Sequence, residues 1–164
     1  MKEIKQFIKE NTTEERVKNA RNNTEIIAKK FFELKGYIVK QSSRDEDFNG
    51  IDLKVYSKRE DKDIYIDVKC SEDKNQKTRN FLYTTSSVNG KLYTRKKTDY
   101  VAFIDFPTNS ITLISFDNLK ELIDKTEDKP SRDGGKGAYH LLLKDDVRNL
   151  GNSYDLNTGN GKNI

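Results

Sequence analysis

The chain has 164 residues, of which 33% are hydrophobic and 35% are charged, and its formal net charge is +4 at pH 7. This length suits a single domain with its own core, and the regular spacing of the apolar residues excludes global disorder. The single cysteine excludes an intrachain disulfide framework and fits a reducing compartment. We therefore expect a cytoplasmic protein without a signal peptide or membrane segment. It should have one domain over 1–150 and a loosely ordered polar tail over 151–164.

The first part of the chain has the apolar spacing of helices. Residues 2–9 predict a short amphipathic helix, and Thr12 with Glu15 has the spacing of a capping box that starts a longer one. This second helix should end at Gly36, which is suited to the position just after a helix. Glu25 lies at the edge of its apolar stripe.

Two strand-like segments follow, after an expected edge strand at 37–39. Residues 50–55 and 64–69 alternate apolar and polar side chains, and the link between them is polar, which predicts a hairpin. The register follows from matching the apolar faces. The matched pairs are Ile51 with Val68, Leu53 with Ile66 and Val55 with Ile64.

This register places Asp52 directly opposite Asp67 on the other face of the hairpin, with Cβ atoms roughly 4.5–5.5 Å apart. Two like charges at that distance destabilise a sheet unless they are offset. A cation between them would offset them, and so would Lys54, which lies diagonal to Asp67. Lys69 faces Gly50, which leaves room for its ammonium group. The other interpretation is an ordinary solvent-exposed face in a highly charged chain.

The second half of the chain adds further strands and a helix. Residues 71–99 form a long polar segment without a clear period. Residues 100–106 are nearly all apolar, which predicts a central strand covered on both faces. After a turn at 107–109 we expect a partner strand at 111–116 and a helix capped by Asp117. Farther along we expect a loop at 125–137, a short strand at 139–143 and a helical turn at 147–150. The predicted class is α/β (α+β), with a central mixed sheet of four to five strands flanked by helices.

Three common kinds of site are not indicated by the sequence. Cys70 should face the core as a free thiol instead of acting as a nucleophile. His140 is the only histidine and has no neighbouring cysteine, which argues against a structural zinc site. The cluster at 134–137 lacks the spacing of a phosphate-binding loop, so we expect no nucleotide cofactor.

The helix, the segment Gly50-Ile51-Asp52 and the segment Asp67-Val68-Lys69 together resemble the PD-(D/E)XK nuclease superfamily, the restriction-endonuclease-like fold. The resemblance covers roughly residues 20–125, and the placement of the motif carries it more than its letters do. Ile51 stands where the family has its name-giving proline, and Asp67 is the less frequent alternative to glutamate. Glu25 is similar to the helix carboxylate found in several branches, including Holliday-junction resolvases.

The resemblance implies a Mg²⁺-dependent endonuclease that cleaves DNA, with Mn²⁺ as a substitute ion. The implied metal ligands are the carboxylates of Asp52 and Asp67, the backbone carbonyl of Val68 and, directly or through water, Glu25. Lys69 would orient the attacking water, help to deprotonate it or stabilise the transition-state charge. The implied catalytic residues are Asp52, Asp67, Lys69 and Glu25. The other interpretation of Glu25 is an ordinary glutamate in the first turn of a helix.

A basic segment at 91–97 is the candidate nucleic-acid contact. Its residues are Lys91, Tyr93, Arg95, Lys96 and Lys97. A solvated loop is the other interpretation of this segment. A homodimer would fit an enzyme that cuts both DNA strands, although no dimer face is evident from the sequence. The alternative function is a catalytically inactive nucleic-acid-binding or assembly protein on the same scaffold. An RNA-directed nuclease has no supporting motif, and resolvase, restriction and repair roles stay open.

Overall fold

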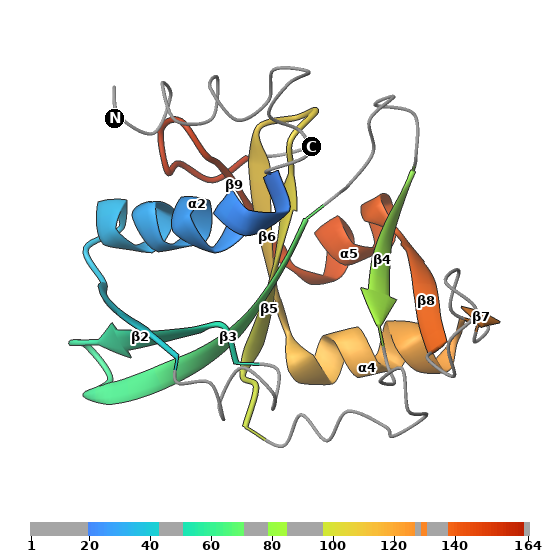
Figure 1. Ribbon diagram of the computed structural model, residues 1–164, viewed down its shortest axis with the longest axis horizontal. Helices are drawn as coiled ribbons and strands as arrows, with labels where there is room; N and C mark the ends of the chain where they lie inside the picture. The colour runs from blue at the N-terminus through green and yellow to red at the C-terminus, as the bar shows by residue number, and fades with distance from the viewer. Residues whose placement is uncertain are drawn as a thin grey trace.

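The computed structural model describes residues 20–42, 51–70, 79–84, 97–126, 129–130 and 138–162. Within these ranges a six-stranded mixed sheet has the order β1-β2-β3-β5-β6-β9, and a three-stranded sheet has the order β4-β8-β7 (Figure 1). The strands of the large sheet are β1 (Ile38–Gln41), β2 (Leu53–Ser57), β3 (Lys62–Cys70), β5 (Tyr100–Asp105), β6 (Ser110–Ser115) and β9 (Asn152–Asp155). Those of the small sheet are β4 (Asn80–Thr84), β7 (Lys129–Pro130) and β8 (Ala138–Leu143). The expected mixed sheet is therefore present, with six strands where four or five were predicted.

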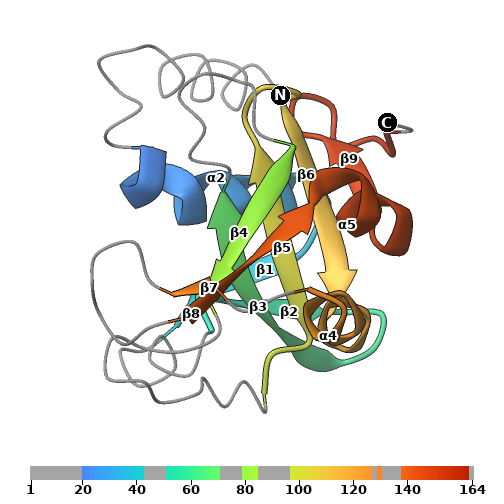
Figure 2. The ribbon, with the colours of Figure 1, turned by 90° about the vertical axis from the view of Figure 1, so that its right-hand side faces the viewer.

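Helices cover both faces of the large sheet. The described helices are α2 (Ala20–Leu34), α4 (Phe116–Asp124) and α5 (Lys144–Leu150). Helix α2 lies on one face, whereas α4, α5 and the small sheet lie on the other (Figures 1 and 2). This arrangement of helices around one sheet defines an α+β fold.

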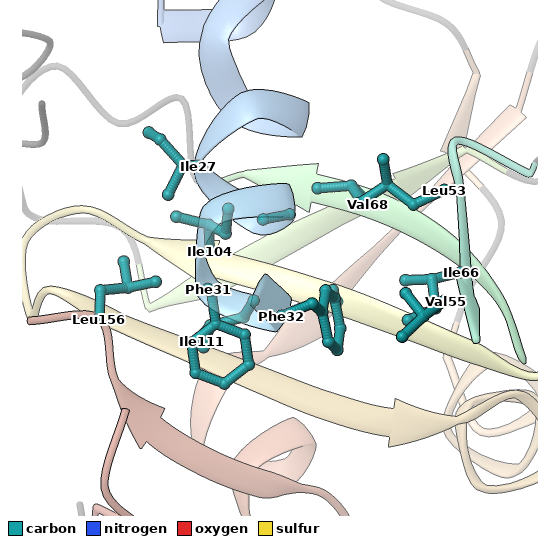
Figure 3. Packing of buried hydrophobic residues seen from close by; sticks show 12 residues of the cluster. Ile27, Phe31, Phe32, Leu53, Val55, Ile66, Val68, Ile104, Ile111 and Leu156 are labelled. Carbon is teal, nitrogen blue, oxygen red and sulfur yellow. The ribbon is translucent and has the colours of Figure 1, made fainter. Parts of the chain in front are cut away.

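Each face of the sheet has its own hydrophobic cluster. Under α2, Phe32 points toward Val55 and Ile66, and Ile27 lies near Ile104 (Figure 3). On the other face Phe103 stacks on Phe81 of β4 with ring centroids 4.6 Å apart. Strand β5 contributes to both clusters, and Val101 through Asp105 are all buried. The prediction of a central strand covered on both faces is confirmed.

The end of α2 follows the predicted glycine. Gly36 has φ +86°. The N–H of Tyr37 donates to Phe32 O and the N–H of Gly36 donates to Glu33 O, both at 3.0 Å. This is the hydrogen-bond pattern of a Schellman motif, in which a residue with a side chain would be strained at the glycine position. The helix ends where expected, and β1 then forms the predicted edge strand.

The motif hairpin has the register that the apolar faces predicted. Strands β2 and β3 are antiparallel, and Leu53 pairs with Ile66 and Val55 with Ile64. The ladder ends at Leu53, so the third expected pair lies beyond it. On its other side β3 pairs with β5 in parallel.

The helix after β6 begins differently from the prediction. Its N-cap is Ser115, whose hydroxyl accepts a hydrogen bond from the N–H of Asn118 at 3.2 Å. Asp117 lies inside the first turn of α4, so its predicted capping role is wrong. Ser115 has the extended backbone that a cap requires and is also a favoured N-cap residue. The preceding turn at 107–109 is confirmed.

The C-terminal segment is part of the sheet. Strand β9 pairs antiparallel with β6, from Ser110 opposite Asp155 to Leu113 opposite Asn152. Leu156 is fully buried, and its N–H donates to Asn109 O at 2.9 Å. The expectation of a loosely ordered tail is therefore wrong for residues 151–162. The free edge of β6 supplies the hydrogen-bond partners that the polar composition did not reveal.

Several expected elements lie outside the described residues. These are the helix at 2–9, the capping box at 12–15 and the glycine cluster at 134–137. The described part of segment 71–99 contains β4, which the sequence did not predict. No helix within the described ranges is long and apolar enough to cross a membrane.

Candidate metal centre

Asp52 lies where the two motif strands separate. It directly precedes β2, and its N–H donates to Ile66 O at 2.9 Å. Its carboxylate accepts a hydrogen bond from the N–H of Val68 at 2.6 Å. The Asp52 carboxylate thus satisfies a backbone N–H of β3 that would otherwise donate to a carbonyl group of a neighbouring strand. Only 9% of the residue is exposed, so this bond fixes a buried carboxyl group.

Asp67 and Lys69 lie on the same face of β3, because residues two apart along a strand point the same way. The ammonium Nζ of Lys69 lies 2.6 Å from Asp67 Oδ1. Asp67 is fully buried, whereas 29% of the Lys69 side chain is exposed. Beside them in β5 are Val101 and Phe103, which belong to the cluster under β4. The carboxylate is therefore held in apolar surroundings, with a lysine between it and solvent.

The surroundings of Asp52 favour its protonated form. Burial, the negative charge of Asp67 and a hydrogen bond between the two carboxyl groups raise the pKa of Asp52 to about 8, against the opposing effects of Lys69 and the Val68 N–H. If both carboxyl groups were ionised, the buried set of Asp52, Asp67 and Lys69 would carry a net negative charge. A proton or a cation must therefore accompany this pair.

The donor set fits a small divalent cation. Mg²⁺ prefers oxygen ligands and is commonly bound by one or two carboxylates, with water and phosphate oxygens as the other ligands. Asp52 and Asp67 supply two carboxylates and a surplus negative charge. Within the described ranges, no group of three or more His, Cys, Asp or Glu side chains is placed to hold a metal. The remaining ligands would thus be backbone oxygen, water or substrate.

Glu25 lies on the helix that covers this end of the hairpin. Figure 3 shows Ile27 and Ile104 under the earlier part of α2, and Phe32 near Val55 and Ile66. Because Ile66 precedes Val68 along β3, the N-terminal part of α2 lies toward the motif end of that strand. Glu25 itself is half-buried, and α2 covers the face of the sheet opposite to the one that carries Asp67 and Lys69. The role of Glu25 as a metal ligand stays a prediction.

The other predicted residues have different outcomes. Lys97 is exposed in the turn that precedes β5, whereas Lys91, Tyr93, Arg95 and Lys96 lie outside the described residues. Cys70 forms no disulfide, has intermediate exposure and packs against the cluster under α2, as expected for its face of β3. His140 is buried and shares a hydrogen bond with the Thr126 hydroxyl at 2.7 Å.

Sequence reasoning missed a second buried charged cluster on the same face of the sheet. Asp105 ends β5, and its carboxylate lies 2.8 Å from the Lys144 ammonium and 2.6 Å from Arg148 Nη2. A signal was available: an aspartate closes a nearly apolar strand, and two cations are spaced i, i+4 on a helix. Only the tertiary structure brings them together.

No protein-family model, curated protein or solved structure matches this chain. The resemblance to a nuclease superfamily therefore rests on the motif residues of this chain alone.

Proposed function

We propose that this protein is a metal-dependent endonuclease that hydrolyses DNA phosphodiester bonds. The observation that carries the proposal is the buried pair Asp52 and Asp67 at the point where β2 and β3 separate, with Lys69 bonded to Asp67. Two adjacent buried carboxyl groups lower the stability of a folded protein. Such a destabilising pair, with a lysine beside it, is typical of a functional site.

Membership in the restriction-endonuclease-like fold is part of this proposal. It is supported by the order of the elements: helix α2, the motif hairpin β2–β3, the buried strand β5, and then β6 and α4. The hairpin register, derived from apolar matching alone, also supports it.

In this proposal each residue has a distinct task. Asp52 and Asp67 hold the metal, and the Val68 N–H keeps the Asp52 carboxylate oriented. Mg²⁺ would supply Lewis-acid stabilisation of the phosphoryl oxygens and lower the pKa of a bound water. Lys69 positions that water or stabilises the charge of the transition state, and its partly exposed ammonium is accessible from solvent. Glu25 would complete the ligand set from α2, directly or through water.

A cleavage panel tests this function. Linear, supercoiled, nicked and four-way-junction DNA are incubated with Mg²⁺ or Mn²⁺, and a single-stranded RNA is included as a further substrate. Wild-type protein should cut at least one DNA, and Asp67→Asn and Lys69→Met should lose activity by at least 100-fold while still binding the DNA. Matched controls on the same strand are Asp63→Asn and Lys62→Gln, which change the same kinds of charge outside the site.

The same panel separates the alternatives. A catalytically inactive nucleic-acid-binding protein would bind DNA but cut nothing with either ion, and calorimetry with Mn²⁺ would then show no binding that depends on Asp52 and Asp67. Cleavage of RNA alone would reassign the substrate. Sedimentation of the DNA complex would show whether a homodimer carries the two active sites that double-strand cleavage needs.

A further inference from the structure

A polar pocket lies at the opposite edge of the large sheet from the motif hairpin. It has a volume of about 490 Å³ and is formed by the end of α5, by β9 and by the chain near Gly161. Figure 2 shows α5 and β9 side by side at this edge. The lining residues with polar side chains that can serve a ligand are Arg148, Asn149, Asn152, Ser153 and Lys162. They include two cations, two amides and one hydroxyl group, which shares a hydrogen bond with the Thr112 hydroxyl at 2.8 Å, and no carboxylate. Tyr154 also lines the pocket, but its ring packs against Phe31 under α2.

The positive charge at this pocket is only partly balanced. Arg148 is 12% exposed and Lys144 is 8% exposed, and both bind the single carboxylate of Asp105. Two buried cations on one buried anion leave a surplus of one positive charge. Arg148 also lines the pocket, so the surplus lies where a ligand can reach the edge of the guanidinium group. Buried charges are stable only when they are paired.

The other contacts of Arg148 and Lys162 do not use all of their N–H donors. Arg148 Nη1 lies 3.4 Å from the carboxylate of Asp145, whose side chain is 88% exposed, so water screens this interaction. The Nε of Arg148 has no hydrogen-bond partner, but it is buried and so is not open to a ligand in the pocket. Lys162 Nζ donates to Thr108 O at 2.5 Å and lies 3.9 Å from Asp155. A lysine ammonium has three donors.

The carbonyl groups at the end of α5 carry partial negative charge and could repel an anion, but two of them already accept hydrogen bonds. Val147 O accepts a hydrogen bond from the Gly151 N–H at 2.9 Å. Leu150 O accepts one from Asn118 Nδ2 at 3.2 Å. Some carbonyl groups at the C-terminal end of this short helix are thus hydrogen-bonded, which weakens the repulsion of an anion by the helix dipole.

We propose that this pocket binds the phosphate group of a nucleotide or of a polynucleotide backbone. A guanidinium, an ammonium, two amides and a hydroxyl group are among the lining residues, and these are donors that bind phosphate oxygens. The pocket has room for a phosphate that is part of a larger molecule. The inference does not rest on the proposed nuclease activity, because it uses neither Asp52, Asp67 nor a metal.

Charge reversal at the rim tests the proposal without disturbing the buried cluster. Asn149 and Asn152 are both exposed, so the double variant Asn149→Asp/Asn152→Asp places two negative charges in the pocket at almost unchanged volume. The control Lys120→Gln/Lys125→Gln changes the net charge by the same amount on exposed positions of α4 and just after it. All proteins are studied as full chains in buffer with EDTA, so that no cleavage occurs.

Titrations with inorganic phosphate, dAMP and a single-stranded oligodeoxynucleotide are followed by amide NMR and calorimetry. Wild-type protein and the control should show shift changes centred on residues 148–154 and 161–162, and the rim variant should lose at least tenfold in affinity. Tighter binding of dAMP than of the oligonucleotide would identify a nucleotide site, and the reverse order a backbone site. Shift changes elsewhere only, or equal affinities for the rim variant and wild type, would overturn the proposal.

Discussion

Two buried charged clusters in this molecule have opposite imbalances. At the motif hairpin, the carboxyl groups of Asp52 and Asp67 outnumber the cation in the set that they form with Lys69, which gives this set a negative surplus when both are ionised. At the end of β5, one carboxylate, Asp105, is shared by Lys144 and Arg148, which leaves a positive surplus. Both clusters lie on the same face of the large sheet. Asp67 pairs with Val101 and Lys69 with Phe103 across the parallel strands β3 and β5, and Asp105 lies two residues after Phe103 and so points to the same face.

The difference shows how one sheet can present sites for ions of opposite sign. A surplus charge in a buried cluster must be met by a proton, a counterion or a ligand. The negative cluster can take up a proton, because a carboxyl group titrates. In the positive cluster Arg148 keeps its charge, because an arginine does not release its proton in a protein. We therefore expect the first cluster to respond to pH and metal ions, and the second to respond to anions.

The largest expected effect follows from neutralising Asp105. In Asp105→Asn, Lys144 and Arg148 lose their buried counter-charge, which should lower the free energy of unfolding by about 3–5 kcal/mol. Urea unfolding at pH 7 measures this loss. The added change Lys144→Met should recover part of it, because it removes one of the stranded cations. Asp124→Asn at the exposed end of α4 is the control and should change stability by less than about 0.5 kcal/mol.

The second prediction concerns pH and the negative cluster. The pKa of Asp52 is about 8 in the folded protein and 3.8 for an unperturbed aspartate, so the folded state binds more protons between these values. The contribution of this group to stability is complete below pH 4 and is lost as the pH rises through about 8. In metal-free buffer the free energy of unfolding of the wild-type protein should therefore fall steadily between these two pH values.

Asp52→Asn checks that assignment. The amide keeps the hydrogen bond from the Val68 N–H but cannot ionise, so its unfolding free energy should lack this decline and exceed that of wild type at pH 8. Denaturant titrations at several pH values compare the two proteins. Asp63→Asn, on the same strand, should keep the wild-type slope. A parallel decline in wild type and Asp52→Asn would show that another group causes it.

Metal ions should stabilise the same cluster at the pH values at which its ionisation destabilises the fold. Mn²⁺ at about one hundred times its dissociation constant should raise the free energy of unfolding of wild type at pH 8 by about 3 kcal/mol. The rise should vanish in Asp67→Asn and should weaken at pH 5, where protons compete for the carboxylates. Thermal unfolding with and without the ion measures it. An equal rise in Asp67→Asn would place the ion elsewhere.

The two clusters also show what the sequence could and could not predict. The register of the motif hairpin was predictable because a one-residue slip would turn Leu53, Val55 and Ile66 away from the core. Asp52 and Asp67 were therefore placed correctly as neighbours from local pattern alone. The sequence could not show that the ladder ends at Leu53 and that the Asp52 carboxylate binds the Val68 N–H instead.

Long-range pairings account for most of what the sequence missed. Asp105 and Arg148 are separated by 43 positions, and no local period links them. The pairing of β9 with β6 depends on a free sheet edge that the Asn- and Gly-rich composition of the segment does not reveal. Asp117 was wrongly chosen as a cap because Ser115, an equally good capping residue, begins the helix sooner.

The smallest expected effect is that of Asp145→Asn, and it decides whether the cluster around Asp105 has a surplus of positive charge. Asp145 is the other carboxylate near Arg148, at 3.4 Å, and its side chain is 88% exposed. If water screens it as its exposure implies, Asp145→Asn should change the free energy of unfolding by less than about 0.5 kcal/mol and leave phosphate affinity unchanged or slightly higher. Urea unfolding and phosphate titration measure both quantities. A loss approaching that of Asp105→Asn would mean that Asp145 neutralises Arg148, and the two clusters would then not be opposites.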